Sequence, residues 1–172
     1  MAKNKRIEIR PLLVADAAAF QKIRVEGLLE SPTAFGSSYE EEVQYALSTV
    51  EERLEPDNGR AVFGAFDGAA LVVVTGIRRE KHLKLMHKTT IWGVYVTTAY
   101  RGIRVGRRLI ESALECARSM KEVWQTTLTV TAANASALTL YLSLGFVEYG
   151  HEPDSVANHG EYYDEKHLIL MF

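Results

Sequence analysis

The chain has 172 residues, of which 47% are hydrophobic and 24% are charged, a composition that fits one folded domain over residues 1–172. Its 20 Lys and Arg against 22 Asp and Glu give a formal net charge of −2, which argues against nucleic-acid and membrane-surface binders because both depend on a basic excess. The first ten residues are charged and carry no apolar signal segment, and no apolar run reaches membrane-spanning length, so we expect a cytoplasmic protein.

The first part of the chain predicts a strand, two helices and a β-hairpin. Residues 7–10 indicate a short strand that Pro11 closes, and residues 16–30 indicate a helix whose apolar face holds Ala19, Phe20, Ile23, Leu28 and Leu29. Ser38, with Glu41 three residues later, forms a capping-box pattern that opens a second helix running to Leu54. The apolar runs 61–66 and 71–78 are joined at Asp67-Gly68, which is a hairpin signal.

The second part alternates strands and helices. We expect a strand over 89–97, a turn over 98–102, a helix over 104–120, a strand over 125–131, a helix over 134–144 that ends at Gly145, and strands over 146–149 and 162–171. The unit from 89 to 130 predicts a parallel, right-handed β-α-β connection. The fold class is therefore mixed α/β, with a mostly antiparallel central sheet flanked by helices.

Cys116 is the single cysteine, so no internal disulfide forms. It lies within the apolar pattern of the helix over 104–120, where a cysteine behaves as a small buried hydrophobe. A nucleophilic role is disfavoured because no His stands near it in the sequence.

The stretch from 94 to 108 runs from a strand through a tight turn with two glycines into a helix. The start of a helix presents unpaired N–H groups and a positive dipole end, which suit a phosphate, and Gly102 and Gly106 allow close approach of the backbone. The arginines in or beside this turn are Arg101, Arg104, Arg107 and Arg108. The patterns of dinucleotide-binding and P-loop sites are absent. Taken alone, the turn is equally well explained by packing glycines and solvated arginines.

A second motif, on the helix over 134–144, favours the phosphate-binding interpretation of the turn, because the two motifs together resemble those of a known family. GNAT enzymes carry [QR]-x-x-G-x-[GA] after their fourth strand and later Asn-x-x-Ala-x-x-x-Tyr-x-x-x-Gly-Phe. This chain has Arg101-Gly102-Ile103-Arg104-Val105-Gly106 and then Asn134, Ala137, Tyr141, Gly145 and Phe146 at the same spacing. The order of elements also resembles that family over nearly the whole chain.

The resemblance implies an N-acetyltransferase that moves the acetyl group of acetyl-CoA directly to a primary amine, with no metal. By position, the backbone of the strand should pair with the pantetheine arm, the turn should hold the pyrophosphate, and Asn134 should contact the cofactor. Tyr141 should face the thioester sulfur and protonate the leaving thiolate. The implied cofactor-binding residues are Val94, Tyr95, Val96, Arg101, Gly102, Ile103, Arg104, Val105, Gly106, Arg107 and Asn134.

The sequence departs from the family at two points. Arg104 stands where the family has a glycine. If the position needs a positive φ, arginine there costs about 1 kcal/mol of stability. Alternatively, its guanidinium adds a charge-assisted contact to a phosphate. Thr90 and Thr129 stand where many relatives carry a glutamate base. No base is assigned; the other titratable candidates are Glu40, Glu42, His82, His87 and Asp164.

By the same resemblance we expect the acceptor to be a small amine, an amino acid, or a peptide N-terminus or lysine, and we expect segments 31–42 and 152–165 to flank its cleft. Neither a nucleic acid nor a membrane is expected as a partner, and a homodimer is allowed. Two alternatives stay open: a non-catalytic acyl-CoA-binding or sensing module of the same fold, and an unrelated α/β interaction domain.

Overall fold

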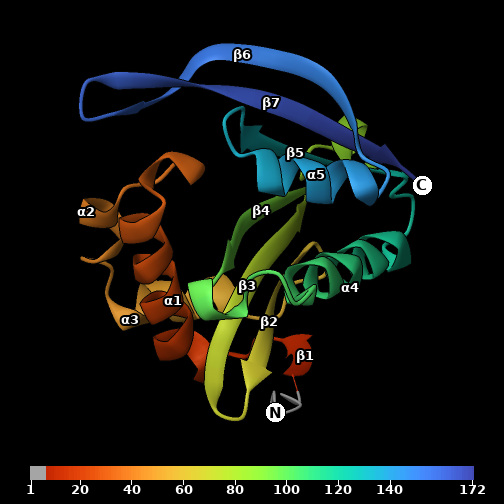
Figure 1. The fold of residues 1–172 in the computed structure, drawn as a ribbon. Coiled ribbons are helices and arrows are strands. Elements are labelled where there is room, and N and C mark those ends of the chain that lie inside the picture. The colour runs from red at the N-terminus through yellow and green to blue at the C-terminus, as the bar shows by residue number, and fades with distance from the viewer. Residues whose placement is uncertain (1–6) are drawn as a thin grey trace.

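The computed structural model describes residues 7–172 and contains a seven-stranded sheet with helices on both faces (Figure 1). The sheet order is β1-β2-β3-β4-β5-β7-β6, and every neighbouring pair is antiparallel except β4 and β5. The strands are β1 (Ile7–Pro11), β2 (Arg60–Asp67), β3 (Ala70–Arg79), β4 (Lys88–Val96), β5 (Gln125–Thr131), β6 (Val147–Asn158) and β7 (Glu161–Met171). The helices are α1 (Ala17–Glu30), α2 (Tyr39–Glu42), α3 (Leu47–Leu54), α4 (Val105–Ser119) and α5 (Ala135–Ser143). This arrangement confirms the predicted fold class.

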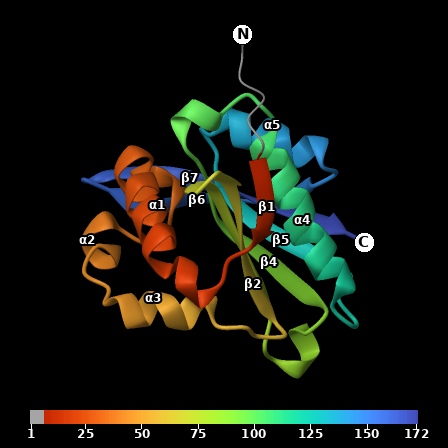
Figure 2. The same cartoon turned by 90° about the horizontal axis from the view of Figure 1, so that it is seen from below.

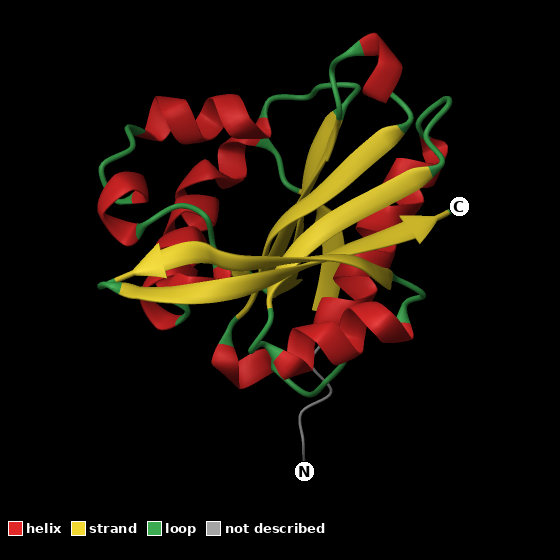
Figure 3. Ribbon diagram, turned by 90° about the horizontal axis from the view of Figure 1, so that it is seen from above, coloured by secondary structure: helices red, strands yellow, loops and turns green. Residues whose placement is uncertain are grey.

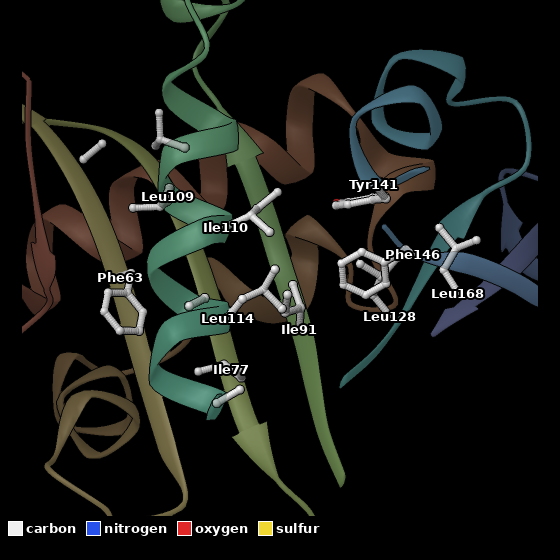
Figure 4. Packing of buried hydrophobic residues seen from close by; sticks show 14 of the residues in the cluster. Phe63, Ile77, Ile91, Leu109, Ile110, Leu114, Leu128, Tyr141, Phe146 and Leu168 are labelled. Carbon is white, nitrogen blue, oxygen red and sulfur yellow. The ribbon is translucent and has the colours of Figure 1, made fainter. Parts of the chain in front are cut away.

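Two hydrophobic cores lie on opposite faces of the sheet. Figure 2 shows α1 and α3 on one side of the central strands and α4 on the other. The core on the α4 face includes Leu109, Ile110 and Leu114, which pack on Phe63 and Ile77 of the sheet (Figure 4). The core on the α1 face is built around the buried side chains of Phe20, Ile23, Leu28, Val50 and Leu54. Helix α4 is therefore amphipathic in the predicted way, with its apolar face on the sheet.

The two central strands pair over only a few residues. The parallel ladder joins Lys88–Thr90 of β4 to Gln125–Thr127 of β5, and no pairing continues beyond it within the described chain. The predicted β-α-β unit is thus parallel as expected. Because the strands separate after Thr90, residues 91–96 and 128–131 leave an opening in the middle of the sheet.

Helix α1 and the helices after it differ from the prediction. In α1, Leu29 is exposed and Ala19 is half-buried, whereas Arg24 and Gly27 are buried together with Phe20 and Ile23. The capping box at Ser38 is confirmed, since its hydroxyl accepts from the Glu41 N–H. The predicted single helix to Leu54 is wrong, because α2 ends at Glu42 and α3 begins only at Leu47.

The last two strands form a hairpin much longer than predicted. Strand β6 continues to Asn158 although residues 150–158 were expected outside a strand, and it pairs with β7 around irregularities near Pro153. An edge strand with a bulge tolerates proline, because the missing N–H faces away from the ladder. Figure 3 shows this hairpin lying across the sheet, and in Figure 1 its turn lies above α1 and α2.

Candidate active site

A cavity of about 820 Å³ occupies the opening between β4 and β5. It extends from the start of α4 to α5 and is closed on one side by residues between α1 and α2. The predicted site residues that line it are Val94, Tyr95, Val96, Arg101, Gly102, Arg104, Val105, Gly106, Arg107, Asn134 and Tyr141. Ile103 does not line it, and its side chain is 53% exposed. The two motifs therefore meet in one cavity.

The turn before α4 has a backbone that only some residues adopt. Gly102 has a φ of 77°, and the helix N-cap Arg104 has a φ of 62°, which is the left-handed region where an L residue is strained. The structure thus shows that the position of Arg104 needs a positive φ. Gly106 lies against β4, since a Cβ there would stand 3.1 Å from Val96 Cγ2. The first N–H groups of α4 have no partner inside the helix, and the residues that carry them, Val105, Gly106 and Arg107, line this end of the cavity.

The arginines of this turn are held differently from one another. Arg101 donates to the Val96 carbonyl at 3.0 Å and to Glu30 at 2.9 Å. Arg107 pairs with Glu111 one turn later at 2.9 Å. Within residues 7–172 the Arg104 guanidinium has no hydrogen-bond or ion-pair partner, although it lines the cavity. Arg104 is therefore the cavity's one available cation of the three, because the other two are partly neutralised.

A β-bulge interrupts β4 beside the cavity. Tyr95 pairs with Val74 and Trp92 pairs with Gly76, so Gly93 and Val94 together lie opposite the single residue Thr75. Gly93 has a φ of 63°, as glycine has in bulges of this kind. A bulge leaves one backbone unit out of the ladder and redirects it. The bulge was not predicted, and its only signal in the sequence is a glycine inside a β-rich run.

Tyr95 contributes its backbone to the cavity side and sends its hydroxyl to α1. The hydroxyl donates to Glu26 at 3.0 Å and to Glu30. Burial and these two carboxylates raise the pKa of Tyr95. The hydrogen bonds from Tyr95, Thr98 and Arg101 lower the pKa of Glu30, so this carboxylate is a weak proton acceptor.

Tyr141 lies at the other end of the cavity, on α5. Its ring is buried and meets Phe146 edge-on at 6.0 Å, and in Figure 4 it extends from α5 towards the space beside α4. Burial raises the pKa of its hydroxyl, so the group stays protonated at physiological pH. The hydroxyl has no hydrogen-bond partner among the described residues. Tyr141 can thus donate a proton to a group bound in the cavity.

Asn134 is the N-cap of α5, because its side-chain oxygen accepts from the Ala137 N–H at 3.2 Å. The oxygen is also 3.2 Å from the Ser136 hydroxyl. Asn134 also lines the cavity, so the capping role and a ligand contact through its amide NH₂ are compatible. Gly145 follows α5 with a φ of 94°, which confirms the predicted end of this helix.

No Asp, Glu or His is among the described residues that line this cavity. Of the candidate bases, Glu42 is buried against Arg24, Asp164 bonds to His151 at 2.8 Å, and His87 stacks on Trp124. Thr129 lines the cavity, whereas Thr90 does not. Segment 31–42 contributes Ser31, Ala34 and Phe35 to the lining, and segment 152–165 contributes nothing.

Further features of the described residues concern metal ligation, membrane crossing and the single cysteine. Among residues 7–172 no three His, Cys, Asp or Glu side chains gather at a spacing that would hold a metal ion. No helix in the same part of the chain is long and apolar enough to cross a bilayer. Cys116 is half-buried on α4 and its pKa is raised by burial.

The acetyltransferase (GNAT) family model matches residues 26–146. A curated relative, spermidine N(1)-acetyltransferase of Vibrio cholerae serotype O1, is 26% identical over 89 residues, and this match spans about half the length of each chain (52% and 51%). The range matched by the family model contains both the glycine turn before α4 and the motif on α5.

Solved structures resemble nearly the whole length of the chain. A GNAT-family acetyltransferase from Streptococcus pneumoniae gives a TM-score of 0.85 at 20% identity, over 97% of this chain and 100% of that one. Ribosomal-protein-alanine N-acetyltransferase from Brucella melitensis gives a TM-score of 0.82 at 23% identity, over 96% of this chain and 99% of that one. The yncA protein from Salmonella typhimurium, solved with its cofactor acetyl-CoA, gives a TM-score of 0.78 at 20% identity, over 96% of this chain and 93% of that one. At these identities the likeness shows the fold.

Proposed function

This chain belongs to the GNAT family of acetyltransferases, and from that premise we propose that it transfers the acetyl group of acetyl-CoA directly to a primary amine. The observation that carries the proposal is the single cavity that has a glycine turn and a helix N-terminus at one end and the Tyr141 hydroxyl at the other. A phosphate-binding end and a proton donor are the two features that a CoA thioester requires.

The cavity residues fit acetyl-CoA by their donor set. The free N–H groups at the start of α4 and the unpaired guanidinium of Arg104 suit the pyrophosphate. The separated edge of β4, at Val94 and Val96, is available to an extended chain such as pantetheine, as in strand addition. The solved relative from Salmonella typhimurium carries acetyl-CoA, which supports this choice of cofactor.

Bound acetyl-CoA supplies a thioester carbonyl, and the amine attacks its carbon as the bond to sulfur breaks. The residues that we assign to this step act by position and by proton donation. Gly93 and Val94 of the bulge both line the cavity, and we assign a backbone N–H of this bulge to stabilise the carbonyl oxygen as charge develops on it. The Tyr141 hydroxyl gives its proton to the departing sulfur, and the proton that the nitrogen loses on forming the amide passes to solvent, from which the Tyr141 phenolate is reprotonated.

The amine has to arrive neutral, because no carboxylate or imidazole of the described chain lines the cavity to take its proton. A direct transfer also agrees with the place of Cys116, which does not line the cavity and whose pKa is raised. A covalent acyl-cysteine would need a thiolate inside the cavity. We therefore propose a single displacement with Tyr141 as general acid.

The test is amine-dependent release of CoA. Thiol release from acetyl-CoA is followed with a panel that holds spermidine, a peptide with an N-terminal alanine, and free amino acids. We expect release with at least one class at a rate well above hydrolysis. Binding of acetyl-CoA without release by any amine would establish the non-catalytic acyl-CoA-binding module instead, and failure to bind acetyl-CoA would reject both.

A further inference from the structure

A second cavity, of about 380 Å³, lies on the α1 face of the sheet and adjoins the first. Trp92 lines both cavities. The lining of the smaller one is dominated by arginine: its members are Arg24, Ser37, Glu42, Tyr45, Arg53, Arg60, Ala61, Val62, Arg78 and Trp92. They come from α1, the α1–α3 connection, α3 and strands β2, β3 and β4. We refer to this cavity as the arginine pocket.

Two of its arginines face each other across neighbouring strands. Arg60 of β2 and Arg78 of β3 are direct cross-strand partners, so their side chains leave the sheet on the same face. Val62 stands two residues after Arg60 on that face and belongs to the core under α1. Like charges placed directly opposite one another destabilise a sheet unless something neutralises them. Their placement indicates a site for an anion.

A third arginine keeps an unsatisfied donor in the pocket. Arg24 is buried, and its guanidinium binds Glu42 and, at 3.1 Å, the Ser37 hydroxyl. Its remaining nitrogen, Nη1, is buried without a hydrogen-bond partner among the described residues, and so is Arg60 Nε. Buried donors without partners are uncommon because each one has lost its hydration. Arg24 Nη1 and Arg60 Nε are thus donors left for a ligand, whereas Arg60 Nη2 already donates to the Glu52 carbonyl at 2.6 Å.

The pocket keeps a positive charge after its carboxylates are counted. Arg53 lies over the Tyr45 ring at 4.6 Å and 3.6 Å from Glu42, and Asp57 lies 3.8 Å from Arg60. Four guanidinium groups against Glu42 and Asp57 leave two positive charges in excess. Within residues 7–172 Arg78 has no ion-pair partner.

The pocket is close to the reacting end of the larger cavity. The Trp92 indole lies over Gly76, where a Cβ would come within 2.1 Å of Trp92 Cε2, so only glycine at position 76 leaves room for it. Arg24 Nη1 is 3.1 Å from the place that a Cβ on Gly93 would take, and Gly93 belongs to the bulge of β4. A small molecule can therefore span the distance from the bulge to the guanidinium groups.

We propose that the arginine pocket binds an anionic group, a carboxylate or a phosphate, on the acceptor whose amine is acetylated. This inference rests on the proposed acetyltransferase function and narrows its substrate to amines that also carry a negative charge. Guanidinium groups bind both anions through paired N–H donors. A polyamine, which has only positive charges, would be repelled by the same groups. The chain would thus differ in acceptor class from the spermidine acetyltransferase that it resembles over half its length.

The test compares matched amines with and without the anion. The pairs are free amino acids with their carboxamides, and O-phosphoethanolamine with ethanolamine; spermidine is added. Binding to the protein saturated with CoA is measured by titration calorimetry, and kcat/KM is measured where turnover occurs. Variants Arg78→Gln and Arg60→Gln remove guanidinium groups, and Arg118→Gln on α4, which is exposed and lines neither cavity, serves as the matched control.

We expect at least one anionic amine to bind roughly tenfold or more tightly than its uncharged partner, about the value of one charge-assisted hydrogen bond. Arg78→Gln and Arg60→Gln should each remove most of this preference, and Arg118→Gln should keep it. Equal binding of the members of every pair, or tighter binding of spermidine, would overturn the proposal. A preference that survives in both pocket variants would overturn it too.

Two further arms separate the sources of failure. In the first arm, inorganic phosphate is added to assays with uncharged amines, for the wild-type protein and for Arg78→Gln. If phosphate changes the turnover of the wild-type protein but not that of Arg78→Gln, and no anionic amine is preferred, the pocket binds a free anion and the proposal is wrong. Acetyl-CoA is titrated into every variant. If the wild-type protein does not bind acetyl-CoA, the proposed function itself fails. If it binds acetyl-CoA but shows no preference for anionic amines, this inference alone fails.

Discussion

The two adjoining cavities are built in different ways. The larger one is shaped by the backbone: a bulge at Gly93, a turn at Gly102, the N-terminus of α4 and the separation of β4 from β5. The arginine pocket is shaped by charged side chains that come from five separate parts of the chain. A backbone site depends on local conformation, and a side-chain site depends on distant residues meeting. The two should therefore respond differently to substitution.

The largest expected effect tests the one side chain to which we assign chemistry in the larger cavity. Tyr141→Phe keeps the buried ring but removes the hydroxyl, so kcat should fall about 10²- to 10⁴-fold while acetyl-CoA affinity stays close to wild type. Steady-state kinetics and calorimetry measure the two quantities. Tyr141→Ala is the comparison, because it should also cost about 3–5 kcal/mol of stability by leaving a cavity. A Phe variant with wild-type kcat, with chemistry limiting, would mean that the cavity acts through its backbone alone.

The next effect concerns the ion pair that holds the arginine pocket together. Glu42→Ala leaves the buried Arg24 guanidinium uncompensated, so the free energy of unfolding should fall by about 3–5 kcal/mol. Chemical denaturation measures it, and Glu40→Ala is the control, since Glu40 is exposed on the same helix. A loss below about 1 kcal/mol would show that the pair is not a structural element of the pocket.

The same carboxylate gives a pH dependence with a definite sign. Burial alone would raise the pKa of Glu42, but hydrogen bonds from Arg24 and Ser37 and the charges of Arg24 and Arg53 lower it below its ordinary value of 4.5. A lowered folded-state pKa means that the stabilisation is fully present above pH 4.5 and is lost as the pH falls through the folded pKa. Stability curves of wild type and Glu42→Gln should therefore converge in acid below pH 4.5.

A third effect follows from the lack of acidic and imidazole groups in the lining of the larger cavity. For an acceptor amine with a pKa near 10.4, kcat/KM should rise about tenfold per pH unit from pH 7 to 9, because only the neutral amine attacks. Tyr141 stays protonated over this range because burial raises its pKa. A plateau near neutral pH would reveal a base that the cavity lining does not show, and variants of His82, His87 and Asp164 would then be compared.

Features that depend on local backbone conformation could be predicted from the sequence, whereas features that depend on distant side chains meeting could not. The turn at Gly102 and the helix ends at Ser38 and Gly145 depend on neighbours in sequence, and the structure confirms those elements. The arginine pocket could not be predicted, because Arg24, Arg60 and Arg78 meet only through the pairing of β2 with β3 and the packing of α1. The break between α2 and α3 also escaped prediction, since Val43 and Leu47 fit an apolar helical face but are exposed.

The smallest effect concerns the left-handed residue at the start of α4. Arg104→Gly should relieve the positive φ and raise stability by up to about 1 kcal/mol, which is a rise in Tm of roughly 2–4 °C for a chain of this size. Glu122→Gly is the matched control, because Glu122 also has a positive φ, of 67°, and does not line the cavity. If Arg104 contacts a phosphate, its variant alone should also lose acetyl-CoA affinity. Equal affinity in both variants would leave the backbone as the whole phosphate site.

The most direct test of the account is whether acetyl-CoA binds at the start of α4. Acetyl-CoA at 100 times its dissociation constant should stabilise the wild-type protein by about 2.7 kcal/mol, seen as a rise in Tm. Gly106→Leu should abolish that rise, because a side chain at position 106 would collide with Val96 and fill the cavity. Gly68→Ala, in an open hairpin turn, should retain it. No rise in wild-type Tm at millimolar acetyl-CoA, or an undiminished rise in Gly106→Leu, would contradict the account.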